Sequence, residues 1–346
     1  MASNKRKKLR VIVLVDQELM PPESVDGLTE KQMLPMVNEY DVIETLKKIG
    51  HEVLPVGITD EMRVLRKAID EFSPDIIFNL LVELHGQVLY EPYIVSYLEL
   101  LQQRYTGCNP RGLMLAQDKA LTKQVLAYHR IPVPAFAVFP LNKKPKRPAR
   151  LEFPLLVKSL LEDGSTGISQ ASIVKEDEAL SERVEFIHRS TRGPAIAEQY
   201  IDGREIYVAV LGNQRLQTFP PWELVLQNLP SGAPYIATSK LKWDKSYQKR
   251  IGLETKPADL PQEVLRNLDH VSKRIYRSLH LSGYARIDYR LTEDGRLYLL
   301  EANPNPDISR KEDLAESARH SGVGYEDLLQ KILNLGLSYR SDRIPW

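Results

Sequence analysis

The first eighty residues alternate between strand and helix patterns, and this alternation limits the fold more than any other feature of the chain. Short apolar runs at 9–16, 51–58 and 74–81 have the length and composition of buried strands. Between them, 33–50 and 61–72 repeat apolar residues at helical spacing. Strands that alternate with helices predict a parallel sheet with helices on its faces. We therefore expect an α/β arrangement at the start of the chain.

The pattern changes after residue 140. The stretch KKPKRPAR at 143–150 is basic and interrupted by prolines, which predicts an exposed connection between domains. Strand patterns dominate beyond it, at 154–160, 194–201, 204–212, 283–291 and 296–305. Helices are expected at 93–104, 115–130, 176–190, 261–280 and near 324–335, and 212–260 has no clear pattern. The second part of the chain therefore reads as α+β.

Composition excludes several classes of protein. With 42% hydrophobic and 27% charged residues, the chain has the balance of a globular protein rather than a disordered one. The 47 basic residues nearly cancel the 46 acidic ones, so no overall field favours nucleic acid or a membrane surface. No apolar stretch is long enough to span a membrane. The single cysteine, Cys108, allows no internal disulfide. We therefore expect a cytoplasmic protein without nucleic-acid or membrane partners.

The strands at 284–303 form an acidic hairpin. Asp294-Gly295 is a strong turn signal, and a two-residue turn there would place Asp288 opposite Glu301. Side chains alternate between the two faces of a strand. One face should therefore carry Arg286, Asp288, Glu301 and Asn303, and the other should carry Ile287, Tyr289, Leu300 and Ala302. Pro304 and Pro306 should end the pairing at Asn303 and leave a loop that borders a cleft.

Two opposed carboxylates repel each other unless a cation lies between them. The carboxylates of Asp288 and Glu301 and the amide oxygen of Asn303 are hard ligands that suit magnesium. Magnesium usually takes one or two carboxylates and completes its shell with water and substrate phosphates. The hairpin therefore fits a nucleotide-magnesium site. The alternative is a solvated face on which Arg286 neutralises an acid.

Phosphate binding must come from an uncommon motif, because neither the P-loop pattern nor a complete G-x-G-x-x-G is present. Lys158 lies on a strand pattern just before a Gly-Ser-Thr-Gly loop, whose backbone N–H groups could close over an anion. Lys119, which opens a helix, and Lys242 are read as surface lysines unless another feature points to them. Glu198 and Glu205 flank a turn and could accept from adenine or ribose, or could simply be exposed.

Taken in order, DKALTK, LLVKSLLEDGSTG, AEQYIDGREI, LKWD, ARIDYR and EANPN resemble the ATP-grasp superfamily, and within it the D-alanine-D-alanine ligase branch. The segment from Glu83 to Gly107 resembles the N-terminal part of that branch. The resemblance implies a Rossmann-like domain at 1–114 and two α+β domains, at 115–197 and 198–346, that grip ATP between their sheets.

The resemblance also implies a role for each matched residue. ATP would be contacted by Lys119, Lys158, Glu162, Ser165, Thr166, Gly167, Glu198, Gln199, Tyr200, Ile201, Glu205 and Lys242. In this set, the loop at 162–167 closes over the γ-phosphate, residues 198–201 read adenine, and Glu205 binds ribose. Asp288, Glu301 and Asn303 would hold two magnesium ions, with manganese as an alternative. The catalytic residues would be Arg286, Lys242, Ser165 and His85.

The implied reaction is ADP-forming ligation of a carboxylate to an amine through an acyl phosphate, with amino acids or small peptides as substrates. In this scheme Arg286 stabilises the oxyanion, and relatives in the branch are commonly homodimers. Two alternatives stay open: a true D-alanine-D-alanine ligase of cell-wall synthesis, and an ATP-binding regulatory protein without catalysis.

The chain departs from the branch at two substrate-binding segments. VDQELMPPESVDG stands where the branch has a glycine-rich loop after the first strand. NPNPDISRKEDLAES replaces the segment that holds the second alanine. Both departures concern substrates rather than ATP, so the substrates are expected to differ from D-alanine.

Overall fold

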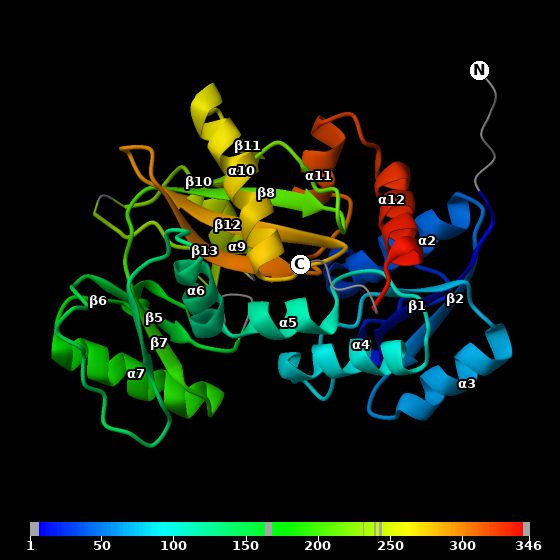
Figure 1. The fold of residues 1–346 in the computed structure, drawn as a ribbon, viewed down its shortest axis with the longest axis horizontal. Helices are drawn as coiled ribbons and strands as arrows, with labels where there is room; N and C mark the ends of the chain where they lie inside the picture. Colours follow the sequence, from blue (N-terminus) through cyan, green and yellow to red (C-terminus); the bar gives the residue numbers. More distant parts are fainter. Residues whose placement is uncertain (1–6, 163–167, 231, 239, 242–243, 342–346) are drawn as a thin grey trace.

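The computed structural model describes residues 7–162, 168–230, 232–238, 240–241 and 244–341. Three β-sheets organise these residues, and helices cover them (Figure 1). The mixed architecture matches the predicted fold class. Each sheet is built from consecutive strands, so the three sheets follow one another along the chain. The domain boundaries at 114 and 197 stay a prediction.

The first sheet is parallel, as the strand and helix alternation predicts. It has the order β2-β1-β3, formed by β1 (Arg10–Asp16), β2 (Glu52–Ile58) and β3 (Ile76–Asn79). The helices α2 (Val37–Lys48), α3 (Met62–Phe72) and α4 (Glu91–Leu100) lie in the connections or directly after them. The central strand β1 is buried because both of its neighbours and both of its faces are covered.

The second sheet is antiparallel and small. Its order is β4-β7-β5-β6, with β4 (Phe136–Phe139), β5 (Leu155–Ser159), β6 (Ile173–Val174) and β7 (Ala195–Gln199). One face packs on α7 (Asp177–Thr191) through its own core of buried side chains, which includes Val157, Val184 and Ile187. In Figure 1 this unit lies at the lower left, with α7 below the strands.

The third sheet is also antiparallel, with the order β11-β10-β8-β12-β13 and β9 attached to β8. Its strands are β8 (Arg204–Leu211), β9 (Gln217–Thr218), β10 (Trp222–Leu226), β11 (Leu253–Pro257), β12 (Tyr284–Leu291) and β13 (Leu297–Pro304). The long helix α10 (Gln262–Ser278) crosses it (Figure 1). The apolar side of this helix, including Ile275, packs against Ile287 and its neighbours on the sheet.

The last two helices join the third sheet to the first. These helices are α11 (Asp313–His320) and α12 (Tyr325–Ser338). Their buried residues, such as Ile332, pack in one core with Val13 of β1, Leu46 of α2 and Ala209 of β8. The first and third sheets therefore share buried cores, whereas the second sheet has a core of its own.

Two predicted boundaries are wrong. The helix expected at 115–130 is two helices, α5 (Pro110–Gln117) and α6 (Lys119–Tyr128). They separate at Asp118, whose carboxylate accepts from the N–H groups of Ala120 and Leu121 and so caps α6. Strand β13 continues to Pro304, which is paired with Ala285. A proline is tolerated there because β13 is an edge strand.

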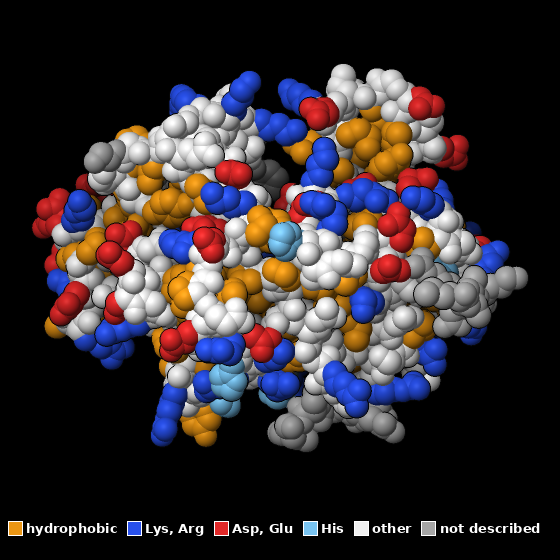
Figure 2. All heavy atoms as spheres, turned by 90° about the horizontal axis from the view of Figure 1, so that it is seen from above, with side chains coloured by type: hydrophobic (Ala, Val, Ile, Leu, Met, Phe, Trp, Pro, Cys, Tyr) orange, Lys and Arg blue, Asp and Glu red, His pale blue; other side chains and the backbone are white. Residues whose placement is uncertain are grey.

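The remaining elements are short: α1 (Glu30–Met33), α9 (Lys245–Ile251), and the 3-10 helices η1 (Gln17–Leu19), η2 (Leu34–Met36), η3 (Val88–Tyr90) and η4 (Gln170–Ser172). Within the described ranges, no helix combines the length and the apolar character needed to cross a membrane. Basic and acidic side chains are interspersed over the face shown in Figure 2, in line with the near-zero net charge.

Candidate functional site

The acidic hairpin has the predicted pairing at its functional end. Asp288 of β12 lies opposite Glu301 of β13, and Arg286 lies opposite Asn303. All four side chains line one cleft between the second and third sheets, whose volume is about 110 Å³. The two carboxylates therefore face the same space, as the sequence predicts.

The predicted two-residue turn is wrong, and a bulge explains why the pairing is still right. The strands are joined by the five residues 292–296, and near the turn Tyr289 is paired with Leu299. The register shifts between Asp288 and Tyr289, which leaves Leu300 as the extra residue of a β-bulge. Leu300 consequently lines the cleft instead of joining the buried face with Leu299.

Asp288 is the centre of a hydrogen-bond network. Arg286 donates to both of its carboxylate oxygens, at 2.8 and 2.9 Å, and the Asn303 amide donates at 2.9 Å. The Arg286 guanidinium also stacks 4.7 Å from the centre of the Tyr207 ring and lies 3.9 Å from an Asp313 oxygen. Burial pulls the pKa of Arg286 down, but the Asp288 carboxylate raises it well above its usual value. Arg286 is therefore a fixed cation.

The pairing of β12 with the neighbouring strand β8 adds a second pair of charges on the same face, Arg290 of β12 and Glu205 of β8. Arg290 donates to a Glu205 oxygen at 3.1 Å and to the Gly203 carbonyl at 3.1 Å. The Tyr207 hydroxyl donates to the other Glu205 oxygen at 2.9 Å. Glu205 is thus oriented into the cleft by two donors.

The second sheet provides the opposite wall. Two lysines, Lys158 of β5 and Lys123 of α6, each lie 3.3 Å from the same oxygen of Glu198 on β7. All three side chains are buried. Burial would raise the pKa of Glu198, but the two lysines lower it below its ordinary value, while burial lowers the pKa of Lys123. The wall therefore carries one carboxylate between two ammonium groups.

Lys119 begins α6 and reaches across the cleft. Its ammonium donates to the Glu162 carbonyl at 2.7 Å and lies 3.9 Å from a Glu301 oxygen. It therefore connects the residue before the glycine-rich loop with the acidic hairpin.

Residues 199–201 link the second sheet to the third. The N–H groups of Gln199 and Tyr200 are used by the carbonyls of Ala135 and Pro154. Within the described part of the chain, the N–H of Ile201 has no backbone carbonyl partner of this kind.

The described part of the chain does not settle the place of every predicted residue. Ser165, Thr166, Gly167 and Lys242 lie outside the described residues. His85 is exposed on a tight turn with φ of 55°, where its ring contacts Tyr90 edge-on. His85 is absent from the residues that line the cleft, and its catalytic role stays a prediction.

The donor set fits a magnesium nucleotide better than a metal bound by protein alone. Within the described ranges, no group of three or more His, Cys, Asp or Glu side chains could hold a metal ion. Asp288, Glu301 and Asn303 offer two carboxylates and one amide, and magnesium commonly completes such a set with phosphate oxygens and water. Lysines on the opposite wall supply the positive charge that phosphates need.

Sequence reasoning missed Lys123, Arg290, Tyr207 and Asp313. Lys123 was detectable, because it follows Lys119 by four residues and so lies on the same helix face. Arg290 and Tyr207 follow from side-chain alternation once β12 is paired with β8. Asp313 gives no local signal, because it reaches Arg286 from a separate helix.

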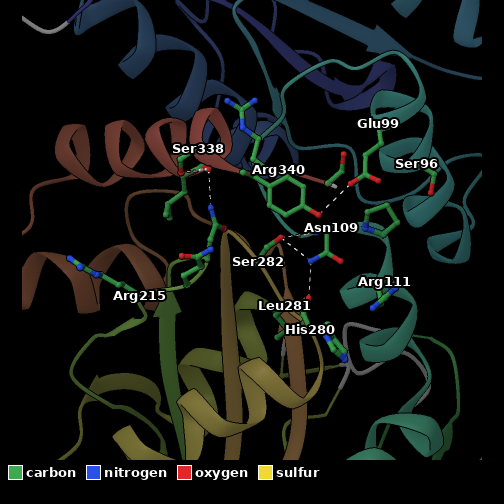
Figure 3. Close-up of a pocket in the computed structure, with 16 residues that line it drawn as sticks. Ser96, Glu99, Asn109, Arg111, Arg215, His280, Leu281, Ser282, Ser338 and Arg340 are labelled. Atoms are coloured by element: carbon green, nitrogen blue, oxygen red, sulfur yellow. Dashed lines mark hydrogen bonds between the residues drawn. The ribbon is translucent and has the colours of Figure 1, made fainter. Parts of the chain in front are cut away.

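A larger cavity lies elsewhere. Its volume is about 590 Å³, and it is formed by α4, α5, the end of α12, and the turns around Asn213 and Leu281 (Figure 3). Arg215 and Arg111 lie on opposite sides of it. None of the predicted site residues that the structure describes lines this cavity. Cavity size alone therefore does not locate the candidate site.

Comparison with known proteins identifies the family of this chain. The family described as D-ala D-ala ligase C-terminus matches residues 125–334. A D-alanine--D-alanine ligase from Desulfotalea psychrophila is 32% identical over 275 residues, 79% of this chain and 81% of the relative. One from Geotalea uraniireducens is 28% identical over 309 residues, 89% of this chain and 92% of the relative.

Solved structures show the same fold. The D-alanine--D-alanine ligase from Bacillus anthracis complexed with ATP has a TM-score of 0.74 at 22% identity, covering 95% of this chain and 97% of that one. The VanG D-Ala:D-Ser ligase from Enterococcus faecalis has a TM-score of 0.70 at 21% identity, covering 95% of this chain and 100% of that one.

Fold and comparisons define an ATP-grasp enzyme that forms carbon–nitrogen bonds. Within that class, the chain belongs to the D-alanine-D-alanine ligase family.

Proposed function

We propose that this protein is an ADP-forming ligase that joins the carboxylate of one amino acid or small peptide to the amine of another. The single observation that supports this most is the cleft in which Arg286, Asp288, Glu301 and Asn303 face Lys158 across a narrow space. Arg286 and Lys158 are cations on opposite walls of the cleft. Together they can hold a triphosphate against the carboxylates of the hairpin.

The roles proposed for the residues come from the resemblance to the family, and the contacts of the described residues support them. ATP would lie between the two sheets, with its adenine near Glu198 and the N–H of Ile201, its ribose at Glu205, and its phosphates at Lys119 and Lys158. Two magnesium ions, or manganese in their place, would be held by Asp288, Glu301 and Asn303 and would neutralise phosphate charge. Ser165, Thr166 and Gly167, with Glu162, would close over the γ-phosphate, and Lys242 would reach it.

The chemistry would proceed in two transfers. The first substrate's carboxylate attacks the γ-phosphorus of ATP, giving an acyl phosphate and ADP. The second substrate's amine then attacks the acyl carbon and expels phosphate. Arg286, whose two hydrogen bonds to Asp288 fix its guanidinium in the cleft, would donate to the oxyanion of that second step.

The substrates are proposed to be amino acids, with D-alanine alone as the second candidate because the relatives are named D-alanine--D-alanine ligase. Single turn-over assays should measure ADP release and product mass with magnesium, ATP and a panel of D- and L-amino-acid pairs. Product from D-alanine alone identifies the second candidate. Absence of ADP release with every pair, despite ATP binding, would indicate a regulatory ATP-binding protein instead.

We further propose a cytoplasmic homodimer. The single cysteine, Cys108, is buried and fits a reducing compartment. Tyr93 and Leu100 of α4 are 60% and 81% exposed, and large apolar side chains at the surface favour association. Light scattering after size-exclusion chromatography tests this, and a monomeric mass would contradict it.

A further inference from the structure

Lys123 contacts both walls of the cleft. It lies on α6 and is 1% exposed. Its ammonium is 3.3 Å from the Glu198 carboxylate on the second sheet and donates at 3.1 Å to the Leu300 carbonyl on the third. A buried ammonium is costly unless it is paired and hydrogen-bonded, and here it has both kinds of partner.

The Leu300 carbonyl belongs to the extra residue of the β13 bulge. The preceding residue, Leu299, donates its N–H to the Pro132 carbonyl at 3.0 Å, just beyond α6. Both ends of the bulge are therefore bound from outside the sheet, by α6 and the segment after it. A bulge leaves its extra residue unpaired in the ladder, so such outside contacts help to fix it.

The bulge decides where Glu301 points. Continuing the register found at Leu299 would pair Asp288 with Leu300 and turn Glu301 to the opposite face, because a shift of one residue exchanges faces. With the bulge, Glu301 faces the cleft beside Asp288. Whatever holds the bulge therefore also holds the pair of carboxylates.

We propose that Lys123 is a positioning residue of the metal site. It fixes the Leu300 bulge and connects it to Glu198 on the opposite wall, which belongs to the second sheet. The proposal rests on the proposed function, because it assumes that Asp288 and Glu301 bind the metal of a metal nucleotide. Lys158 shares the Glu198 oxygen at the same distance of 3.3 Å, so removal of Lys123 alone still leaves Glu198 paired.

The test compares Lys123→Met with Lys158→Met. Isothermal titration should measure the Kd of a non-hydrolysable ATP analogue with and without magnesium, and the ratio of the two values is the gain in affinity due to the metal. We expect Lys123→Met to reduce this ratio about tenfold to a hundredfold, the range found when groups that orient a metal ligand are removed. Lys158→Met loses the other lysine on Glu198 but not the contact with Leu300, so it should weaken nucleotide binding and leave the ratio within about twofold.

Two further measurements keep the test decisive. Hydrogen exchange of the protein without ligand should become faster at 299–301 in Lys123→Met, and Leu126→Ala on the same helix controls for lost packing. If Lys123→Met does not fold, Lys123→Leu removes the same donor with a different apolar side chain. A ratio within twofold of wild type in the folded Lys123 variant overturns the proposal. A wild-type protein without any gain from magnesium overturns the proposed metal site, and this proposal with it.

Discussion

The two walls of the cleft are held in place in different ways. The wall with Asp288 belongs to a sheet whose buried side chains join those of the first sheet in shared cores. The wall with Lys158 belongs to a small sheet that packs on α7 through a separate core. Lys119 and Lys123 make charged contacts between the two walls. We therefore predict that the wall with Lys158 can unfold separately from the wall with Asp288.

The largest expected effect on the rate comes from a substitution in the wall with Asp288. Arg286→Lys keeps the charge but loses the planar pair of hydrogen bonds to Asp288. We expect kcat to fall about a hundredfold or more, because donors at an oxyanion typically contribute that much. Steady-state kinetics with the product-forming pair measures it. Arg296→Lys, at the exposed hairpin turn, should have no effect, and equal losses in both variants would contradict the assignment.

Glu301→Gln tests the same wall through the metal. The amide keeps the size of the side chain but removes a charge that faces the cleft. We expect the magnesium concentration for half-maximal rate to rise about tenfold to a hundredfold, with partial recovery at high magnesium. Glu293→Gln, on the exposed turn, is the matched control. An unchanged magnesium dependence in Glu301→Gln would remove this residue from the metal site.

The stability of the part of the molecule built on the shared cores should also depend on pH. Burial raises the pKa of Glu39 on α2 to about 7, and the neighbouring Asp307 adds to this. A carboxyl group with a raised pKa in the folded state stabilises most below its unfolded pKa, and this stability is lost as the pH rises through 7. Relative to Glu39→Gln, we expect the wild type to lose on the order of 2 kcal/mol between pH 5 and pH 8. Urea unfolding at both pH values tests this, and parallel pH curves would contradict it.

The smallest expected effect is on the stability of the core between the second sheet and α7. Ile187→Val on α7 removes one methylene from a fully buried side chain, at an expected cost of about 1 kcal/mol. Hydrogen exchange should become faster within 136–199 and stay unchanged elsewhere. Ile275→Val on α10 makes the same change in a shared core. Faster exchange throughout the chain in both variants would show that the walls unfold together.

Much of the fold could be predicted because its signals are local. The parallel order of the first sheet follows from strand and helix periods, and the face of β12 follows from alternation. The split at Asp118 was missed although the cap is local, because the apolar pattern continues across it. The partners of Arg286 were harder to predict from the sequence, because Asp313 lies on α11, a helix that follows the sheet.

The pairing of Asp288 with Glu301 was predicted correctly from a turn that is wrong. The five-residue connection moves the register by one residue, and the bulge at Leu300 moves it back. Neither the longer connection nor the bulge has a clear signal in the sequence, since glycine and aspartate suit several turn types. The resemblance to the ligase family grouped Asp288, Glu301 and Asn303 as metal ligands without using the turn.

This compensation affects how relatives should be aligned. Because the bulge resets the register after the connection, the length of 292–296 does not by itself determine which residues face the cleft. A gap placed in that connection says nothing about the site, whereas a gap between Leu299 and Glu301 would exchange the faces of the strand. In homologues, the three residues from Leu299 to Glu301 are therefore the ones to align first.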